Sequence, residues 1–152
     1  MKSVKSIYAA LLLLTALFAM SCEKPAPIPQ EQPIAVTYTT IEGCWQLTHL
    51  QGSPLINDTL LYIEFNRSDR SYTMWDNLNS MYPVKSTGSF AISQEEDGSY
   101  TLSGSYDYGV GAWSNHYRVT LSNEANSMKW LSLGGANEVM DFVRIDQIPE
   151  LN

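Results

Sequence analysis

The chain has few of the side chains from which metal centres, disulfide frameworks and nucleic-acid surfaces are built. Its 152 residues include two cysteines, two histidines, and nine Lys and Arg against 16 Asp and Glu, which gives a net charge of −7. Two cysteines exclude a tetrathiolate metal site, and neither histidine has a companion ligand at i+4 or in a Cys-x-x-Cys pair, so we expect no metal. The shortage of basic residues argues against nucleic acid as a partner, because phosphates reward clustered Lys and Arg.

Catalytic patterns are also missing. His116 has no Ser or Cys placed by a motif to use it as a base, and strand alternation puts it on the outside with Arg118. The acidic stretch from Glu95 to Gly98 has the composition of a hairpin turn, with glycosidase carboxylates as the remote alternative. No Gly-rich loop opens a helix, so no phosphate site is indicated. We therefore expect a protein that is not an enzyme and has no cofactor.

A long apolar run is present only at the start of the chain. Two lysines precede the 14 residues from Ile7 to Met20, and small Ser21 follows them before Cys22. This run is shorter than the roughly 20 residues that a membrane-spanning helix needs. Residues 1–21 are therefore predicted to be a secretory signal peptide.

The next segment predicts a spacer and then one folded domain. Residues 23–33 read EKPAPIPQEQP, with four prolines and no strand or helix period, which is typical of a semi-rigid extended linker. We assign residues 22–40 to this tether, 41–146 to a single compact domain and 147–152 to a C-terminal tail.

The domain has the pattern of an all-β protein. Alternating apolar residues are clearest in Leu61-x-Ile63-x-Phe65, Gly, Asn, Asp and Ser form the turns, and no segment has a convincing helical period. The predicted strands are 43–50, 59–66, 70–76, 86–93, 99–106, 113–122, 127–133 and 138–145. Since most strands follow the previous one closely, neighbours should pair antiparallel as a meander. Eight such strands predict a closed up-and-down barrel, whose interior fits packed side chains or one small ligand.

The end of the signal peptide resembles the lipobox of bacterial lipoproteins. The stretch Leu17-Phe-Ala-Met-Ser-Cys22 carries the resemblance, although Ala19 stands where a strict lipobox has Leu. The resemblance implies that Cys22 is acylated, becomes the mature N-terminus and holds the protein on a membrane by fatty chains such as palmitate. The alternative is plain secretion with a free Cys22, which could pair with Cys44 in an oxidising periplasm.

The start of the domain is similar to the lipocalin-like (calycin) barrels. Gly43-Cys-Trp45 matches the G-x-W that opens them, and Arg144 lies in the final "FVRI". The resemblance implies that Trp45 closes one end of the barrel and that Arg144 lies across its ring. Together with the lipid signal and the spacer, the chain resembles the lipocalin-like domains of bacterial outer-membrane lipoproteins. Larger lipocalins carry a helix before or after the last strand, whereas here we expect only the six-residue tail from Gln147 to Asn152.

The expected function is reversible, non-catalytic binding of a small hydrophobic or amphipathic ligand in the cell envelope. His49 alternates with Trp45 and Leu47, so it is expected to point inward, as a polar handle or as a hydrogen-bonded lining residue. The other inward-facing candidates are Leu61, Ile63, Phe65, Phe90, Tyr117, Val119 and Phe142.

Two other functions stay open. One is an accessory lipoprotein with a filled core that docks on another envelope protein. The other is a glycan-binding module that uses the aromatic loop 106–117, with Tyr108 and Trp113 as stacking platforms. In addition, Asp58-Thr59-Leu60 matches a short O-glycosylation pattern, which makes Thr59 a candidate modification site.

Overall fold

The computed structural model of the protein describes residues 34–56, 58–108, 111–135 and 137–151. The predicted signal peptide, Cys22 and the Pro-rich segment 23–33 lie outside the described residues. Within the described part, no helix is long and apolar enough to cross a membrane.

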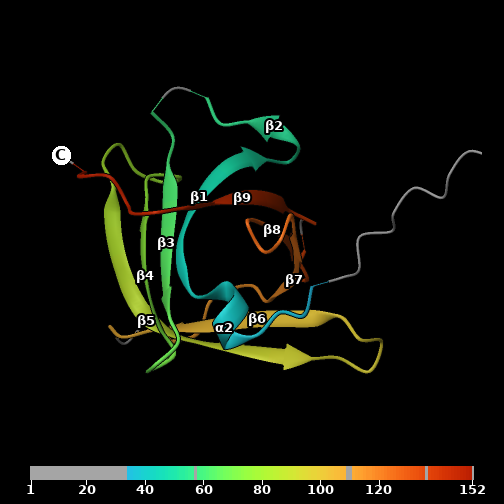
Figure 1. The fold of residues 1–152 in the computed structure, drawn as a ribbon. Coiled ribbons are helices and arrows are strands. Elements are labelled where there is room, and N and C mark those ends of the chain that lie inside the picture. Colours follow the sequence, from blue (N-terminus) through green and yellow to red (C-terminus); the bar gives the residue numbers. More distant parts are fainter. Residues whose placement is uncertain (1–33, 57, 109–110, 136, 152) are drawn as a thin grey trace, which may run out of the picture. The chain divides into compact units, whose positions relative to one another are not determined.

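The domain is an all-β, closed, up-and-down barrel of eight antiparallel strands, which confirms the predicted fold class (Figure 1). Its strands are β1 (Gly43–Leu50), β3 (Leu61–Asn66), β4 (Ser71–Asp76), β5 (Val84–Gln94), β6 (Tyr100–Tyr106), β7 (Tyr117–Ser122), β8 (Ser127–Ser132) and β9 (Val139–Ile145). Each pairs with the next, and β1 pairs with β9 to close the sheet. A two-residue strand, β2 (Ser53–Pro54), folds back on the end of β1.

One predicted strand begins later in the structure than the sequence indicated. The strand expected over 113–122 begins at Tyr117, whereas the others agree with the sequence to within two residues at each end. The reason is a local backbone contact. The Trp113 N–H donates to the Gly104 carbonyl at 2.7 Å, and Ala112 forms an isolated bridge with Ser105. The chain therefore runs irregularly beside the end of β6 before β7 begins. The Trp113 ring occupies the space left by Gly104, where a Cβ atom would lie 2.3 Å from Cε2 of the ring.

The two ends of the barrel differ in how they are filled. At the end where β1 starts and β9 finishes, large apolar side chains point inward and leave little space. The rings of Phe65 and Phe90 lie 4.7 Å apart, and the Phe142 ring lies 4.9 Å from that of Trp130, which also contacts Trp113 towards the other end. Ile63 and Val119 are buried beside them. We call this the closed end, and we call the opposite end, where β1 finishes and β3 starts, the mouth.

The ordered domain begins before residue 41, the expected boundary. Ile34 bridges to Leu121, Val36 is buried, and the Tyr38 ring lies 5.4 Å from the Phe90 ring. These apolar residues alternate along the chain, so every second side chain can pack onto the closed end. A single helical turn, α2 (Tyr38–Ile41), then leads into β1. The segment 34–40, which the sequence assigns to the tether, is thus a cap on the barrel.

Candidate functional site

The mouth half of the barrel is hollow. A cavity of about 710 Å³ opens there, within the range of small-molecule sites. Among the candidates from the sequence, Leu61, Trp113 and Tyr117 line it, as does Thr59. Ile63, Phe65, Phe90, Val119 and Phe142 lie in the filled core instead. The sequence placed all of these on the inner face but could not tell the two halves of the barrel apart.

An aromatic cluster forms one wall of this cavity. The Trp130 ring lies 5.0 Å from the Tyr117 ring and 5.8 Å from the Trp113 ring. Trp113 is fixed further by its Nε1–H, which donates to the Tyr72 hydroxyl at 2.8 Å. Burial raises the pKa of Tyr117, so its hydroxyl stays protonated and can donate a hydrogen bond. The cluster therefore presents a pre-formed apolar surface with a few polar atoms.

A β-bulge in β1 reverses the expected orientation of His49. Leu47 pairs with Phe142, but the next pair is His49 with Asp141, so Thr48 is an extra residue. Its hydroxyl donates to the Asp141 carbonyl at 3.0 Å. Because one extra residue exchanges the two faces of a strand, Leu50 lines the cavity in place of His49. The inward prediction for His49 was therefore wrong, and its Nδ1 lies 3.1 Å from the Thr48 hydroxyl.

Several cavity residues were missed by the sequence analysis. Leu50, Met74, Tyr106, Trp130 and Met140 line the cavity, and so do two acids, Asp76 and Glu138. Met74 and Asp76 follow Tyr72 on the inner face of β4, a period-2 signal that was available in the sequence. Leu50 could have been found only by recognising the bulge.

The aromatic loop does not form a single stacking surface. Trp113 is 8% exposed and faces the interior, whereas Tyr108 is 79% exposed. The two rings expected to act together on a glycan therefore lie in different environments. His116 is exposed, as strand alternation suggested.

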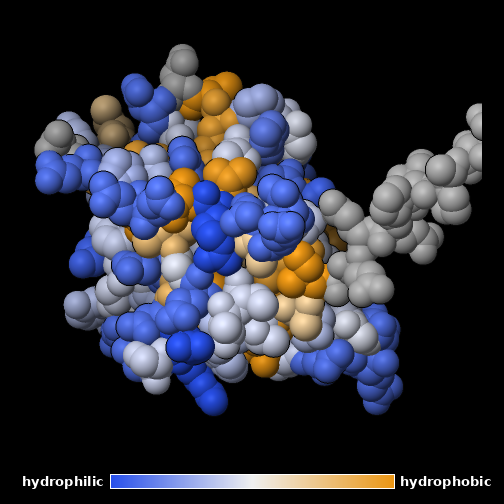
Figure 2. All heavy atoms as spheres, viewed as in Figure 1, coloured by the Kyte–Doolittle hydropathy of each residue, from blue (hydrophilic) through white to orange (hydrophobic). Residues whose placement is uncertain are grey.

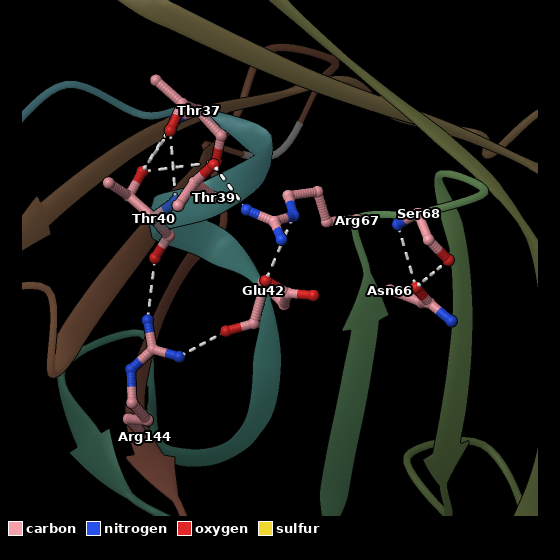
Figure 3. Close-up of polar contacts among 8 residues, drawn as sticks. All are labelled: Thr37, Thr39, Thr40, Glu42, Asn66, Arg67, Ser68 and Arg144. Carbon is pink, nitrogen blue, oxygen red and sulfur yellow. Dashed lines mark hydrogen bonds and ion pairs between the residues drawn. The ribbon is translucent and has the colours of Figure 1, made fainter.

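The closed end is built around Trp45 and Arg144. The guanidinium carbon lies 4.2 Å from the centre of the fully buried Trp45 ring, and the Trp45 Nε1–H donates to the Ile41 carbonyl at 2.8 Å. Arg144 also donates to three carbonyls: Nε to that of Ala125 at 3.0 Å, Nη2 to that of Thr40 at 2.7 Å, and Nη1 to that of Glu42. Figure 3 shows the last two bonds, which join the final strand to the segment before β1.

Gly43 makes room for this arrangement. Its φ is +108°, and a Cβ atom added there would lie 3.0 Å from Nη1 of Arg144. The first residue of the G-x-W pattern is thus a glycine because the backbone conformation and the guanidinium both exclude a side chain. These residues contact each other at the opposite end from the cavity, where they join the first and last strands of the barrel.

Cys44 points to the outer face of β1 and is half-buried. Burial raises the pKa of its thiol, and the nearby Glu64 carboxylate adds to the effect. The thiol is therefore protonated and a poor nucleophile at neutral pH. In the described part of the chain, no group of three or more His, Cys, Asp or Glu residues is placed to hold a metal ion.

The barrel is thus hollow at the mouth, where aromatic rings form one wall of the cavity, and filled at the closed end. No protein-family model matches this chain, and neither does any curated protein.

Proposed function

We propose that this protein is a lipid-anchored, lipocalin-like protein of the bacterial cell envelope that binds a small hydrophobic or amphipathic ligand reversibly and without catalysis. The observation that carries the proposal is the cavity of about 710 Å³ at the mouth of an otherwise filled barrel. Leu50, Leu61 and Met140 give it apolar walls, while Tyr117 and Asp76 supply polar groups. This mixture of apolar and polar side chains suits a small amphipathic molecule.

The anchor is supported by the sequence before the barrel. The lipobox-like ending would make Cys22 the first residue of the mature chain, and the Pro-rich segment 23–33 would hold the domain away from a membrane. Mass spectrometry of the mature N-terminus should find fatty acyl groups on Cys22, and Cys22→Ser should move the protein from the membrane to the soluble fraction. A wild-type protein with an unmodified Cys22 would contradict the anchor and leave the binding proposal standing.

Ligand binding is tested with two variants that differ only in which face of β3 they change. Leu61 is buried and lines the cavity, while its neighbour Tyr62 points outward. Native mass spectrometry of the purified protein after incubation with envelope lipid extract should show a bound small molecule for the wild type and for Tyr62→Trp. Leu61→Trp should weaken this binding, because the larger ring takes up part of the cavity. A wild type that carries nothing would refute the proposal.

A second candidate function, docking on another envelope protein, is favoured by an exposed apolar rim. Among the described residues, every large hydrophobic side chain that is exposed, apart from Val143, lies at the mouth: Ile56, Met81, Tyr82, Val84, Tyr108 and Leu133. Figure 2 shows hydrophobic side chains at the surface where the chain passes from β2 to β3, the segment that carries Ile56. Exposed apolar patches mark interaction sites. Crosslinking in cells should then recover one steady partner, and Met81→Ser with Tyr82→Ser should lose it.

A further inference from the structure

The charged groups of the cavity are all of one sign. Asp76 and Glu138 are the charged side chains in its lining, and none of the described lining residues is Lys, Arg or His. Asp76 ends β4 and Glu138 directly precedes β9, so both carboxylates stand at the mouth. The rings of Trp113 and Trp130 form the wall behind them. The cavity is therefore acidic at its entrance and apolar in its depth.

Asp76 lacks a strong partner. Its Oδ1 accepts one hydrogen bond, from the Leu78 N–H at 3.3 Å, and it forms no ion pair with any described residue. It is half-buried, and burial raises the pKa of the carboxyl. A carboxylate removed from water without a cation gains free energy when a positive group arrives.

The neighbouring rings favour the same kind of ligand. Tyr106, Trp113, Tyr117 and Trp130 line the cavity together with the two acids. The faces of aromatic rings carry negative electrostatic potential and attract ammonium groups, while they also bury alkyl chains. A ligand with a carboxylate is disfavoured, because the two acids at the mouth and the net charge of −7 repel its negative charge.

We propose that the cavity takes an amphipathic organic cation, with its ammonium group at Asp76 and its apolar part among the rings of the inner wall. The inference rests on the proposed function, because it assigns a ligand class to the same cavity. Glu138 adds a second negative charge at the mouth, and Leu61, Met74 and Met140 complete the apolar surface for the tail.

The test uses three probes with the same ten-carbon chain and different head groups: decylamine, decan-1-ol and decanoate. Each is titrated into the full mature protein by isothermal calorimetry near neutral pH, at concentrations where it is dissolved as single molecules. We expect decylammonium to bind about ten-fold more tightly than decanol, since one paired charge is worth at least that factor in a partly buried site. Decanoate should bind most weakly.

Two variants separate a specific contact from the overall charge. Asp76→Asn keeps the shape of the side chain and an oxygen acceptor for Leu78, so the fold is retained. It should lower the affinity for decylammonium about ten-fold and leave that for decanol unchanged. The control is Asp107→Asn, which removes an exposed carboxylate in the connection from β6 to β7, outside the cavity lining. It should bind all three probes as the wild type does.

The outcomes distinguish the two proposals. If decanol binds as tightly as decylammonium, or if Asp76→Asn binds decylammonium unchanged, the cation assignment is overturned while ligand binding in the cavity stands. Tighter binding of decanoate overturns it as well. If none of the three probes binds, the cavity is not a site for amphiphiles, and the proposed function fails together with the inference.

Discussion

Trp45 and Arg144 are direct partners across the strand pair that closes the barrel, and the guanidinium carbon lies 4.2 Å from the ring centre. The first and last strands of the domain are thus joined twice, by their ladder and by this stacked pair. The same guanidinium binds three backbone carbonyls, so removal of either partner affects the closure of the sheet itself.

Trp45→Ala should unfold the domain before it changes any binding. The ring is fully buried and donates a hydrogen bond, and deletion of such a ring costs about 3–5 kcal/mol of unfolding free energy. That is a large share of the stability of a small domain. Urea unfolding followed by circular dichroism measures it. Trp75→Ala is the control, because Trp75 lies half-buried on the outer face of β4 and should cost much less. A stable Trp45→Ala barrel would overturn the structural role of the ring.

Arg144→Lys should destabilise the barrel almost as much as Arg144→Ala does. Lysine keeps a positive charge over the ring but cannot donate to the Ala125, Thr40 and Glu42 carbonyls together. These carbonyls are partly buried, and each one left without its donor costs up to about 1–3 kcal/mol. The free energy of unfolding in urea measures both variants. Full rescue by Lys would mean that the stacked charge, and not the hydrogen bonds, provides the stability.

Asp76→Asn should make the protein relatively more stable as the pH rises. Burial raises the pKa of the Asp76 carboxyl, so at this position the folded state holds a proton more tightly than the unfolded state. The resulting stability is complete below the ordinary Asp pKa of about 3.9 and is lost as the pH rises through the folded value. Urea unfolding at several pH values in that window should show the free energy of unfolding of Asp76→Asn rising relative to that of the wild type as the pH increases.

Asp69 provides the opposite case for the same experiment. Hydrogen bonds from the Ser71 hydroxyl and N–H lower the pKa of its carboxyl, so its contribution is present above the ordinary Asp pKa and is lost as the pH falls. Any advantage of the wild type over Asp69→Asn should therefore shrink in acid. The same direction of change for both variants would contradict these assignments.

Leu50→Asn should weaken ligand binding, and His49→Asn should not. The two residues are adjacent, but the bulge at Thr48 puts only Leu50 in the cavity wall. Loss of one buried Leu contact is worth about 1–2 kcal/mol, or roughly 5- to 30-fold in the dissociation constant. Calorimetric titration with decan-1-ol measures both. If His49→Asn is the weaker binder, β1 has no bulge in solution.

Gly104→Ala should move Trp113 and alter the cavity. An added Cβ atom would lie 2.3 Å from the Trp113 ring, which must shift and lose its hydrogen bond to Tyr72. Overpacking of this kind costs about 1–3 kcal/mol. We expect red-shifted tryptophan fluorescence and weaker binding of decan-1-ol. Ser103→Ala, on the opposite face of β6, should change neither.

The sequence predicted the fold because period-2 alternation and turn residues report directly on which side chains face a core. Leu61, Ile63 and Phe65 show this most clearly, and all three are buried. The same pattern could not locate the cavity. Leu61 at the mouth and Phe65 at the closed end are both apolar and inward, and only the packing of the other strands decides that one lines a void.

Two further features depended on contacts that no local pattern encodes. Thr48 is an ordinary strand residue, and its role as the bulge appears only in the register of β1 against β9. Trp113 alternates correctly with Tyr117, yet it precedes the strand because Gly104, on a different strand, receives its ring.

The extra residue at Thr48 changes the parity of β1. Before it, the odd-numbered residues Trp45 and Leu47 face inward, and after it the even-numbered Leu50 does. β1 therefore contributes odd-numbered side chains to the closed end and an even-numbered side chain to the mouth. Deletion of Thr48 would remove the bulge and still leave Leu50 opposite Met140 and Trp45 opposite Arg144. The bulge is therefore a point at which β1 can lose a residue without changing which of its side chains line the cavity.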